Sequence, residues 1–333
     1  MPPTHPPRRR FGASIASLLA AGALPPSLLA QTREAGTYPS RPVKVVLPFA
    51  PGSVTDLITR ILADRLSQRL GQPFVVDNKA GGNGTIGAGA VAHAAPDGYT
   101  ILFTTNTTHS IIEALLKQVP YDPQKDFTPI ARLAGIPSLV VANPALPIAS
   151  IEQFVAYAKA NPGKLRYGFG NSSGQIGGAT LERELGIRMV AVPYKGNPQA
   201  AQDVMAGHLE AMIADVATAQ PFVKAGRLRA LAVLTDKRLT LMPDVPTLAE
   251  TVSPGFDVIA WFGAFGPAHM PTQALDVLAR ELNLAVQDPG IDAQLRGNGI
   301  APGFVGPAAF GPLLHRERAR WMALARSAGI EPQ

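Results

Sequence analysis

The 333-residue chain contains no cysteine. It therefore has no disulfide bond, no thiolate nucleophile and no cysteine-based metal site. This absence does not oppose export, because a chain with large hydrophobic cores needs no disulfides. The six histidines show no spacing typical of metal ligands, so we expect no metal and no other cofactor.

Charged residues are also scarce, at 16% of the chain, and the one run of three basic residues is Arg8-Arg9-Arg10. Removing these three arginines lowers the formal net charge from +6 to +3. The other basic residues are scattered and not interleaved with aromatic side chains, so we expect no nucleic-acid partner. Since 46% of the residues are hydrophobic, the chain can bury sizeable cores, and its length is sufficient for two domains.

The N-terminus has the order of a secretory signal peptide. Arg8–Arg10 precede an apolar stretch, Gly12–Ala30, which predicts a signal peptide over residues 1–30 with cleavage near Ala30. The arginines also fit a loose twin-arginine pattern, which leaves the export route open. A permanent membrane anchor is the alternative, but Pro25-Pro26 would interrupt a spanning helix. We therefore predict a periplasmic protein.

The stretch Val43–Leu70 predicts a strand, a tight turn and a helix. Val43–Leu47 is an apolar run typical of a buried strand, and Pro48, Pro51 and Gly52 end it. Ser53 occupies the N-cap position of the helix, and Asp56 completes a capping-box pattern. The free N–H groups of such a helix start favour a bound anion.

Two further glycine-rich junctions follow predicted strands. Gly81–Gly89 follows the strand Gln72–Val76, and Gly170–Gly174 follows the strand Leu165–Phe169. Ligands of open α/β sheets bind beyond the carboxyl ends of the strands. We therefore predict that all three junctions face one anionic small molecule.

Alternating strands and helices predict α/β domains, each with a mostly parallel or mixed sheet covered on both faces. We place the first crossing between domains at Asn143-Pro144 and the return crossing at Val258–Phe265. The predicted domains are residues 38–141 plus 262–333, and residues 142–261. The helices predicted at Leu275–Val286 and Phe310–Ala328 should pack on the first domain.

Two short motifs suggest enzymes. Gly82–Gly87 matches G-x-G-x-x-G, but the strand does not run directly into the first glycine, which disfavours dinucleotide binding. Gly170–Gly174 matches the G-x-S-x-G elbow of serine hydrolases, with Asp215 and His269 following in hydrolase order. However, Gly177 and Gly178 should fray the next helix, and Ser172 and Ser173 can equally donate to a ligand or cap that helix.

Other polar and aromatic residues are candidates for either a structural or a ligand-binding role. Asp56 can contact a ligand or cap its helix, and capping is favoured because a carboxylate repels an anion. His109 closes a polar loop at a strand end. Phe49 and Trp261 belong to a core or form the walls of a cleft.

Ordered motifs along Tyr38–Ile330 resemble the solute receptors of tripartite tricarboxylate transporters, often called Bug proteins. The resemblance is carried by Tyr38-Pro39-Ser40-Arg41-Pro42-Val43, Pro48-Phe49-Ala50-Pro51-Gly52 with Asp56, Ala95-Pro96-Asp97-Gly98-Tyr99-Thr100, Val192-Pro193-Tyr194-Lys195-Gly196, Ala225–Val233, Pro243-Asp244-Val245-Pro246-Thr247 and Trp261-Phe262-Gly263.

The resemblance implies a two-domain periplasmic binding protein, type II-like, with Venus-flytrap closure, each domain a mixed sheet flanked by helices. It implies that loop N–H groups and hydroxyls hold a ligand carboxylate. We expect closure about Val140–Asn143 and Ala260–Gly263, because one ligand contacts both walls only when they approach. The implied ligand-binding residues are Phe49, Ala50, Ser53, Asp56, Gly82, Gly84, Thr105, Thr107, His109, Ser172, Ser173, Lys195, Asp215 and Trp261.

We therefore expect a non-enzymatic, monomeric receptor that captures a small carboxylate, either a di- or tricarboxylate or a related organic acid, and delivers it to integral-membrane transporter subunits. Two alternatives stay open at this point. One is a secreted serine hydrolase that uses Ser172, and the other is a ligand-sensing subunit of a signalling system.

Overall fold

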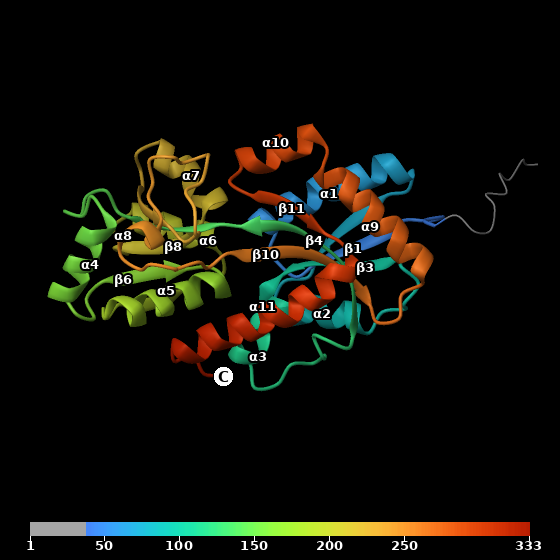
Figure 1. Cartoon of the computed structure of the whole chain (residues 1–333), viewed down its shortest axis with the longest axis horizontal. Helices are drawn as coiled ribbons and strands as arrows, with labels where there is room; N and C mark the ends of the chain where they lie inside the picture. The colour runs from blue at the N-terminus through green and yellow to red at the C-terminus, as the bar shows by residue number, and fades with distance from the viewer. Residues whose placement is uncertain (1–37) are drawn as a thin grey trace, which may run out of the picture. The chain divides into compact units, whose positions relative to one another are not determined.

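The computed structural model describes residues 38–333, so the predicted signal peptide and its cleavage near Ala30 lie outside the described residues. The strands of this part form two mixed sheets (Figure 1). The six-stranded sheet has the order β11 (Ala301–Val305), β4 (Phe127–Ile136), β10 (Ala260–Pro267), β3 (Thr100–Thr105), β1 (Val43–Leu47) and β2 (Phe74–Asn78). The five-stranded sheet has the order β7 (Val190–Pro193), β6 (Arg166–Phe169), β8 (Ala211–Asp215), β5 (Ser138–Ala142) and β9 (Arg229–Val233).

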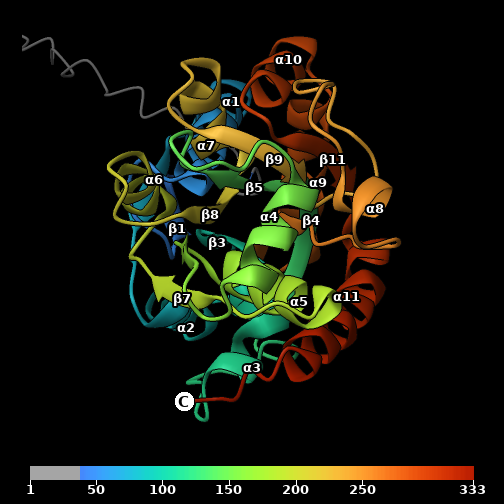
Figure 2. The ribbon, with the colours of Figure 1, turned by 90° about the vertical axis from the view of Figure 1, so that its left-hand side faces the viewer.

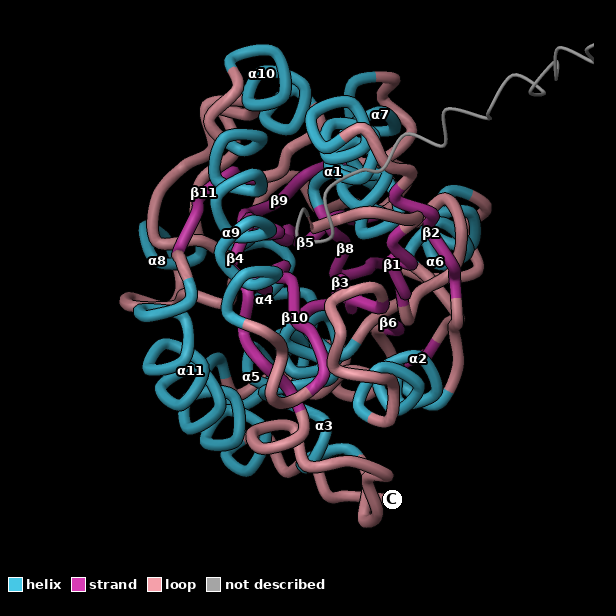
Figure 3. Tube along the Cα trace, turned by 90° about the vertical axis from the view of Figure 1, so that its right-hand side faces the viewer, coloured by secondary structure: helices cyan, strands magenta, loops and turns pink. Residues whose placement is uncertain are grey.

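Helices cover both faces of each sheet. Around the six-stranded sheet (Figure 3) are α1 (Val54–Leu70), α2 (Thr85–Ala92), α9 (Thr272–Val286) and α10 (Pro289–Gly297), with the 3₁₀ turn η1 (Gly82–Gly84) before α2. Around the five-stranded sheet (Figure 2) are α4 (Ile151–Ala160), α5 (Ser172–Leu185), α6 (Asn197–Met205), α7 (Val216–Lys224) and α8 (Leu248–Thr251). The π-helix η2 (Thr107–Ile111), α3 (Ile112–Leu115) and α11 (Pro307–Ser327) complete the described fold.

Successive residues of a strand point to opposite faces, so each sheet has a separate hydrophobic core on either side. Val45 packs with side chains of α1 and α9, whereas Val46, one residue on, packs with α2 and Phe310 on the opposite face. In the second sheet Val140 faces α4 and α5, and Val141 faces α6 and α7. Both sheets are therefore buried on both faces, as the apolar strand runs predict.

The chain changes sheets at Pro137. Strand β4 ends at Ile136 in the first sheet, and β5 begins at Ser138 and pairs with β8 and β9 of the second. This point lies one strand before the crossing that we predicted at Asn143-Pro144, because β5 belongs by its hydrogen bonds to the second sheet. The predicted closure segment Val140–Asn143 is therefore largely strand, and the domain boundaries stay a prediction.

Helix α11 packs against both sheets and not, as predicted, on the first domain alone. Near its start, Phe310 is buried in the core beside Trp261. Near its end, Trp321 and Ala325 are buried in the core of the second sheet with Val140. The helix thus runs from the six-stranded sheet to α5 (Figure 1).

The glycines of α5 do not fray it, so that prediction is wrong. The helix begins at Ser172 and continues through both glycines to Leu185. A Cβ atom on Gly178 would lie 2.3 Å from the ring of Tyr167 in β6. Glycine is needed there because the helix packs directly on an aromatic side chain.

Candidate functional site

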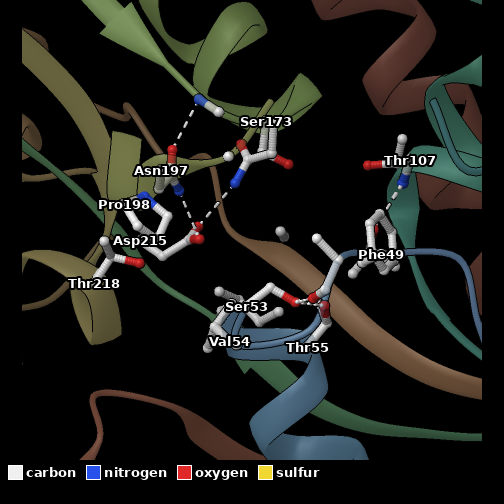
Figure 4. A pocket seen from close by; sticks show the side chains of 18 of the residues that line it. Phe49, Ser53, Val54, Thr55, Thr107, Ser173, Asn197, Pro198, Asp215 and Thr218 are labelled. Atoms are coloured by element: carbon white, nitrogen blue, oxygen red, sulfur yellow. Dashed lines mark hydrogen bonds between the residues drawn. The ribbon is translucent and has the colours of Figure 1, made fainter. Parts of the chain in front are cut away.

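A cavity of about 410 Å³ lies where the two sheets meet (Figure 4). Its walls come mostly from segments that follow the carboxyl ends of β1, β3, β6, β7 and β8. This is the position expected for a ligand in open α/β sheets. The lining residues are Phe49–Thr55, Thr105–Thr107, Ile136, Gly170, Asn171, Ser173, Lys195–Gln199, Asp215, Thr218 and Ala260.

Four helices begin at this cavity. Lining residues include the first turn of α1 (Val54), α5 (Ser173), α6 (Asn197) and α7 (Thr218). Each helix start carries partial positive charge on its free N–H groups. These helix starts bring positive partial charge to the cavity, in addition to Lys195, which is exposed at its edge and is the one basic side chain among its described lining residues. This arrangement suits an anionic ligand.

Ser53 and Asp56 organise the wall from the first sheet. The Ser53 hydroxyl accepts the Asp56 N–H at 3.3 Å and donates to the carbonyl of Ala50 at 2.8 Å. Asp56 does not complete the predicted capping box, because its carboxylate accepts the N–H of Gly52 at 3.0 Å in place of that of Ser53. It also accepts from Arg60 at 3.0 Å and from Asn78 at 3.0 Å.

These contacts determine the charge state of Asp56. Burial alone would raise the pKa of the carboxyl, but the hydrogen bonds from Arg60, Gly52 and Asn78 outweigh it and lower the pKa. Asp56 is 5% exposed and does not line the cavity. Its role in this structure is to hold the turn before α1.

Asp215 organises the wall from the second sheet. Its carboxylate accepts the amide N–H of Asn197 at 2.7 Å and that of Asn171 at 3.1 Å. Burial raises the pKa of Asp215 to about 6, and the two amide hydrogen bonds oppose this rise. Figure 4 shows Asp215, Asn197 and Thr218 together on one side of the cavity, across from Phe49 and Thr55.

Hydroxyl groups join the two walls. The Oγ1 of Thr107 in η2 lies 2.6 Å from the Oγ of Ser172 in α5, and the amide of Asn106 donates to Ser173 at 3.1 Å. These contacts connect the segment after β3 to the segment after β6. π-helices such as η2 are rare and frequently lie at functional sites.

Comparison with known proteins identifies the family. The model of the "Tripartite tricarboxylate transporter family receptor" matches residues 58–330. The chain belongs to this receptor family. It is 32% identical over 300 residues to protein BugT of Bordetella pertussis, covering 89% of this chain and 92% of BugT.

Solved structures of family receptors have the same fold. R. palustris Rpa4515 with adipate shares 33% identity with a TM-score of 0.86, covering 89% of this chain and 100% of that chain. MatC from Rhodopseudomonas palustris with bound malate shares 30% identity with a TM-score of 0.78, covering 86% and 100%. The predicted two-domain α/β binding-protein fold is therefore confirmed, and the chain is a solute receptor and not an enzyme.

The geometry of this receptor agrees with the absence of hydrolase chemistry. The Ser172 hydroxyl is paired with Thr107 and the Asp215 carboxylate with two asparagines, so neither is paired with a histidine. His269 follows the far end of β10, whose near end, Ala260, lines the cavity. At about 3.3 Å per residue, the length of this strand separates His269 from the cavity by roughly 20 Å.

The structure brings many of the predicted site residues of this receptor together. Those that line the cavity are Phe49, Ala50, Ser53, Thr105, Thr107, Ser173, Lys195 and Asp215. Ser172 lies directly behind the lining and is bonded to Thr107. Their contact with a ligand stays a prediction.

The other predicted residues lie outside the lining. Gly82 and Gly84 belong to the second glycine junction, where Gly84 packs against Pro48 and Thr108 instead of facing the cavity. The expectation that all three junctions face one site is thus wrong for the second glycine junction. This junction follows β2, which is an edge strand of the six-stranded sheet.

His109 and Trp261 lie in an aromatic cluster. The ring of His109 stacks on Phe265 with centroids 3.9 Å apart, and burial lowers its pKa to about 3. Trp261 packs on Phe310 in the same core, 2% exposed. Both side chains therefore support the segment below the cavity and do not line it.

Sequence reasoning missed Asn197 and did not single out Asn171. The Gly196-Asn197-Pro198 string carried a signal, because proline is favoured in the first turn of a helix.

Among residues 38–333, no group of three or more potential ligands could hold a metal ion. Between Tyr38 and Gln333, no helix combines the length and apolar character that a bilayer crossing requires. Receptors of this family are periplasmic.

Proposed function

We propose that the protein captures a small carboxylate in this cavity and delivers it to the membrane subunits of a tripartite tricarboxylate-type transporter. The observation that carries the proposal is the convergence of four helix starts on one cavity. Their free N–H groups can hold a carboxylate without an arginine. The adipate and malate bound to the two related receptors support this ligand class.

The size of the cavity limits the ligand. About 410 Å³ is near the lower end of the range of small-molecule sites, which fits a di- or tricarboxylate with a short carbon chain. Lys195 is exposed at the edge and has no ion pair with any described residue, so it can pair with a second carboxylate.

A thermal-shift panel of mono-, di- and tricarboxylates tests the capture of a carboxylate. A ligand at about 100 times its Kd stabilises the folded state by roughly 2.7 kcal/mol, which raises Tm measurably. The matched control is the amide of each active acid with every carboxyl group converted, which keeps the size but removes the carboxylate charges. If no carboxylate raises Tm, or if the amides act equally well, the proposal fails.

Delivery needs a separate experiment. We propose that the receptor is a monomer that docks on the transporter subunits when loaded. Uptake of labelled ligand into proteoliposomes that contain the membrane subunits should require the receptor. Co-purification with a sensor kinase domain, and no stimulation of uptake, would instead favour the signalling role.

A further inference from the structure

Asp215 occupies the N-cap position of α7 but does not cap it. Its side chain accepts no hydrogen bond from the first turn of that helix. An aspartate at this position normally accepts one from the second or third helical N–H. The carboxylate is instead directed toward the cavity, where it forms part of the lining (Figure 4).

The two asparagines beside Asp215 are held in one orientation. The Oδ1 of Asn197 accepts the N–H of Gly170 at 2.8 Å, and the Oδ1 of Asn171 accepts the N–H of Gly174 at 2.8 Å. Because both amide oxygens are occupied by backbone donors, both NH₂ groups are directed at Asp215. The two NH₂ groups therefore favour a hydrogen-bond acceptor, such as the carboxylate of Asp215, at this position.

This carboxylate has unused acceptor capacity. An ionised carboxylate has about four lone-pair sites, and one amide donor reaches each oxygen of Asp215. No cation pairs with it among the described residues, although it is only 6% exposed. A buried charge without a cation is costly unless further donors reach it. The cavity is the side from which such a donor can come.

We propose that Asp215 is a specificity residue that accepts a hydrogen bond from the ligand, so that the preferred ligands are carboxylates bearing an ammonium or hydroxyl group. This inference rests on the proposed function. The helix starts hold the carboxylate, and Asp215 holds the donor. An ammonium group should be preferred to a hydroxyl, because it also neutralises the charge of Asp215.

The charges around Asp215 set the pH dependence. Asn171 on α5 and Asn197 on α6 are neutral, Ser138 is its register partner on β5, and Lys195 is the other charged residue that lines the cavity. With a pKa of about 6, Asp215 is ionised at pH 8 and largely protonated at pH 5. The preference for a ligand ammonium should therefore weaken as the pH falls.

Isothermal titration calorimetry with matched ligands tests the inference. The probes are succinate, malate and aspartate, then the plain, 2-hydroxy and 2-amino dicarboxylates of five and six carbons. At pH 8 and the best chain length, the amino acid should bind about tenfold or more tightly than the plain acid, with the hydroxy acid between them. At pH 5 the difference in affinity between the amino acid and the plain acid should be smaller.

Two variants assign the effect to Asp215. Asp215→Asn should remove most of the preference at pH 8, whereas Asp215→Glu should retain part of it. Asp244→Asn, at an exposed position outside the lining, is the matched control and should bind like the wild type. If Asp215→Asn does not fold, the wild-type protein still tests the inference. The measurement is then the change, between pH 8 and pH 5, in the affinity for the amino acid relative to the plain acid.

The outcomes separate the two proposals. Plain dicarboxylates that bind as tightly as their amino and hydroxy counterparts at every length would overturn the inference and leave the carboxylate receptor intact. A preference that is unchanged between pH 8 and pH 5, or in Asp215→Asn, would also overturn it. Absence of binding by every carboxylate would overturn the proposed function and, with it, this inference.

Discussion

Asp56 and Asp215 stand near helix starts on opposite walls of the same cavity, yet their surroundings differ in kind. Asp56 is bonded to a guanidinium, a backbone N–H and an amide, and its pKa is lowered. Asp215 is bonded to two neutral amides, and burial raises its pKa to about 6. The first acid is part of the scaffold, whereas the second retains capacity for an external partner.

The glycines of the two walls differ in a similar way. At Gly52 an added Cβ atom would meet no atom within 4 Å, so it is the φ of +77° and not a lack of space that favours glycine. At Gly170 a Cβ atom would lie 2.0 Å from the backbone nitrogen of Asn197, so space requires glycine there. The first wall is a turn that needs a left-handed residue, and the second is a close approach of two backbones.

Gly170→Ala should have the largest effect, because the added methyl meets backbone atoms that cannot rotate away. We expect a loss of about 3 kcal/mol in the free energy of unfolding, measured by urea denaturation. Gly196→Ala is the matched control on the same wall, since its Cβ would have its nearest contact at 3.7 Å. Equal losses in both variants would contradict the close-approach explanation.

Asp56→Ala should cost about 2–3 kcal/mol of unfolding free energy at neutral pH, because it removes hydrogen bonds to a buried charged group. Since the pKa of Asp56 is lowered, this loss should shrink as the pH falls below about 4. Asp64→Ala, on the exposed face of α1, should change stability by less than about 0.5 kcal/mol. A small loss of unfolding free energy in Asp56→Ala would contradict the stabilising role of this carboxylate.

Asp215→Asn should have the smallest effect and the opposite pH trend. Because the folded-state pKa of Asp215 is raised, its favourable contribution is present below about pH 4 and is lost as the pH rises through about 6. Without ligand, the variant should therefore gain stability relative to the wild type between pH 4 and pH 8, on the order of 2 kcal/mol. Urea denaturation across this range measures the gain, and a constant difference would contradict it.

Local patterns predicted many elements because their signals lie within a few residues. The strand Val43–Leu47 and the helix Ile151–Ala160 have the predicted bounds, the latter capped by Ser150. Pairing between distant segments left no such signal. We did not predict β4, which contains Pro129 and Arg132, and no local pattern showed which sheet β5 would join.

Predictions about the site failed where tertiary packing decided the outcome. A glycine pair usually weakens a helix, but in α5 Tyr167 fills the space that a side chain at Gly178 would need. His109 was predicted in a polar loop, but η2 turns its ring onto Phe265. The importance of Asn171 and Asn197 depends on their distance from Asp215, which only the folded chain shows.

The two anchor points of α11 have a consequence for the order of folding. The core behind α5 includes residues from Ile111 to Ala325, and Gln333 is hydrogen-bonded to Leu115 and Lys117. Contacts so distant in sequence form slowly, because a long loop must close before they contribute. Because a chain is synthesised from its N-terminus, nearly all of it must therefore be available before this half can be completed.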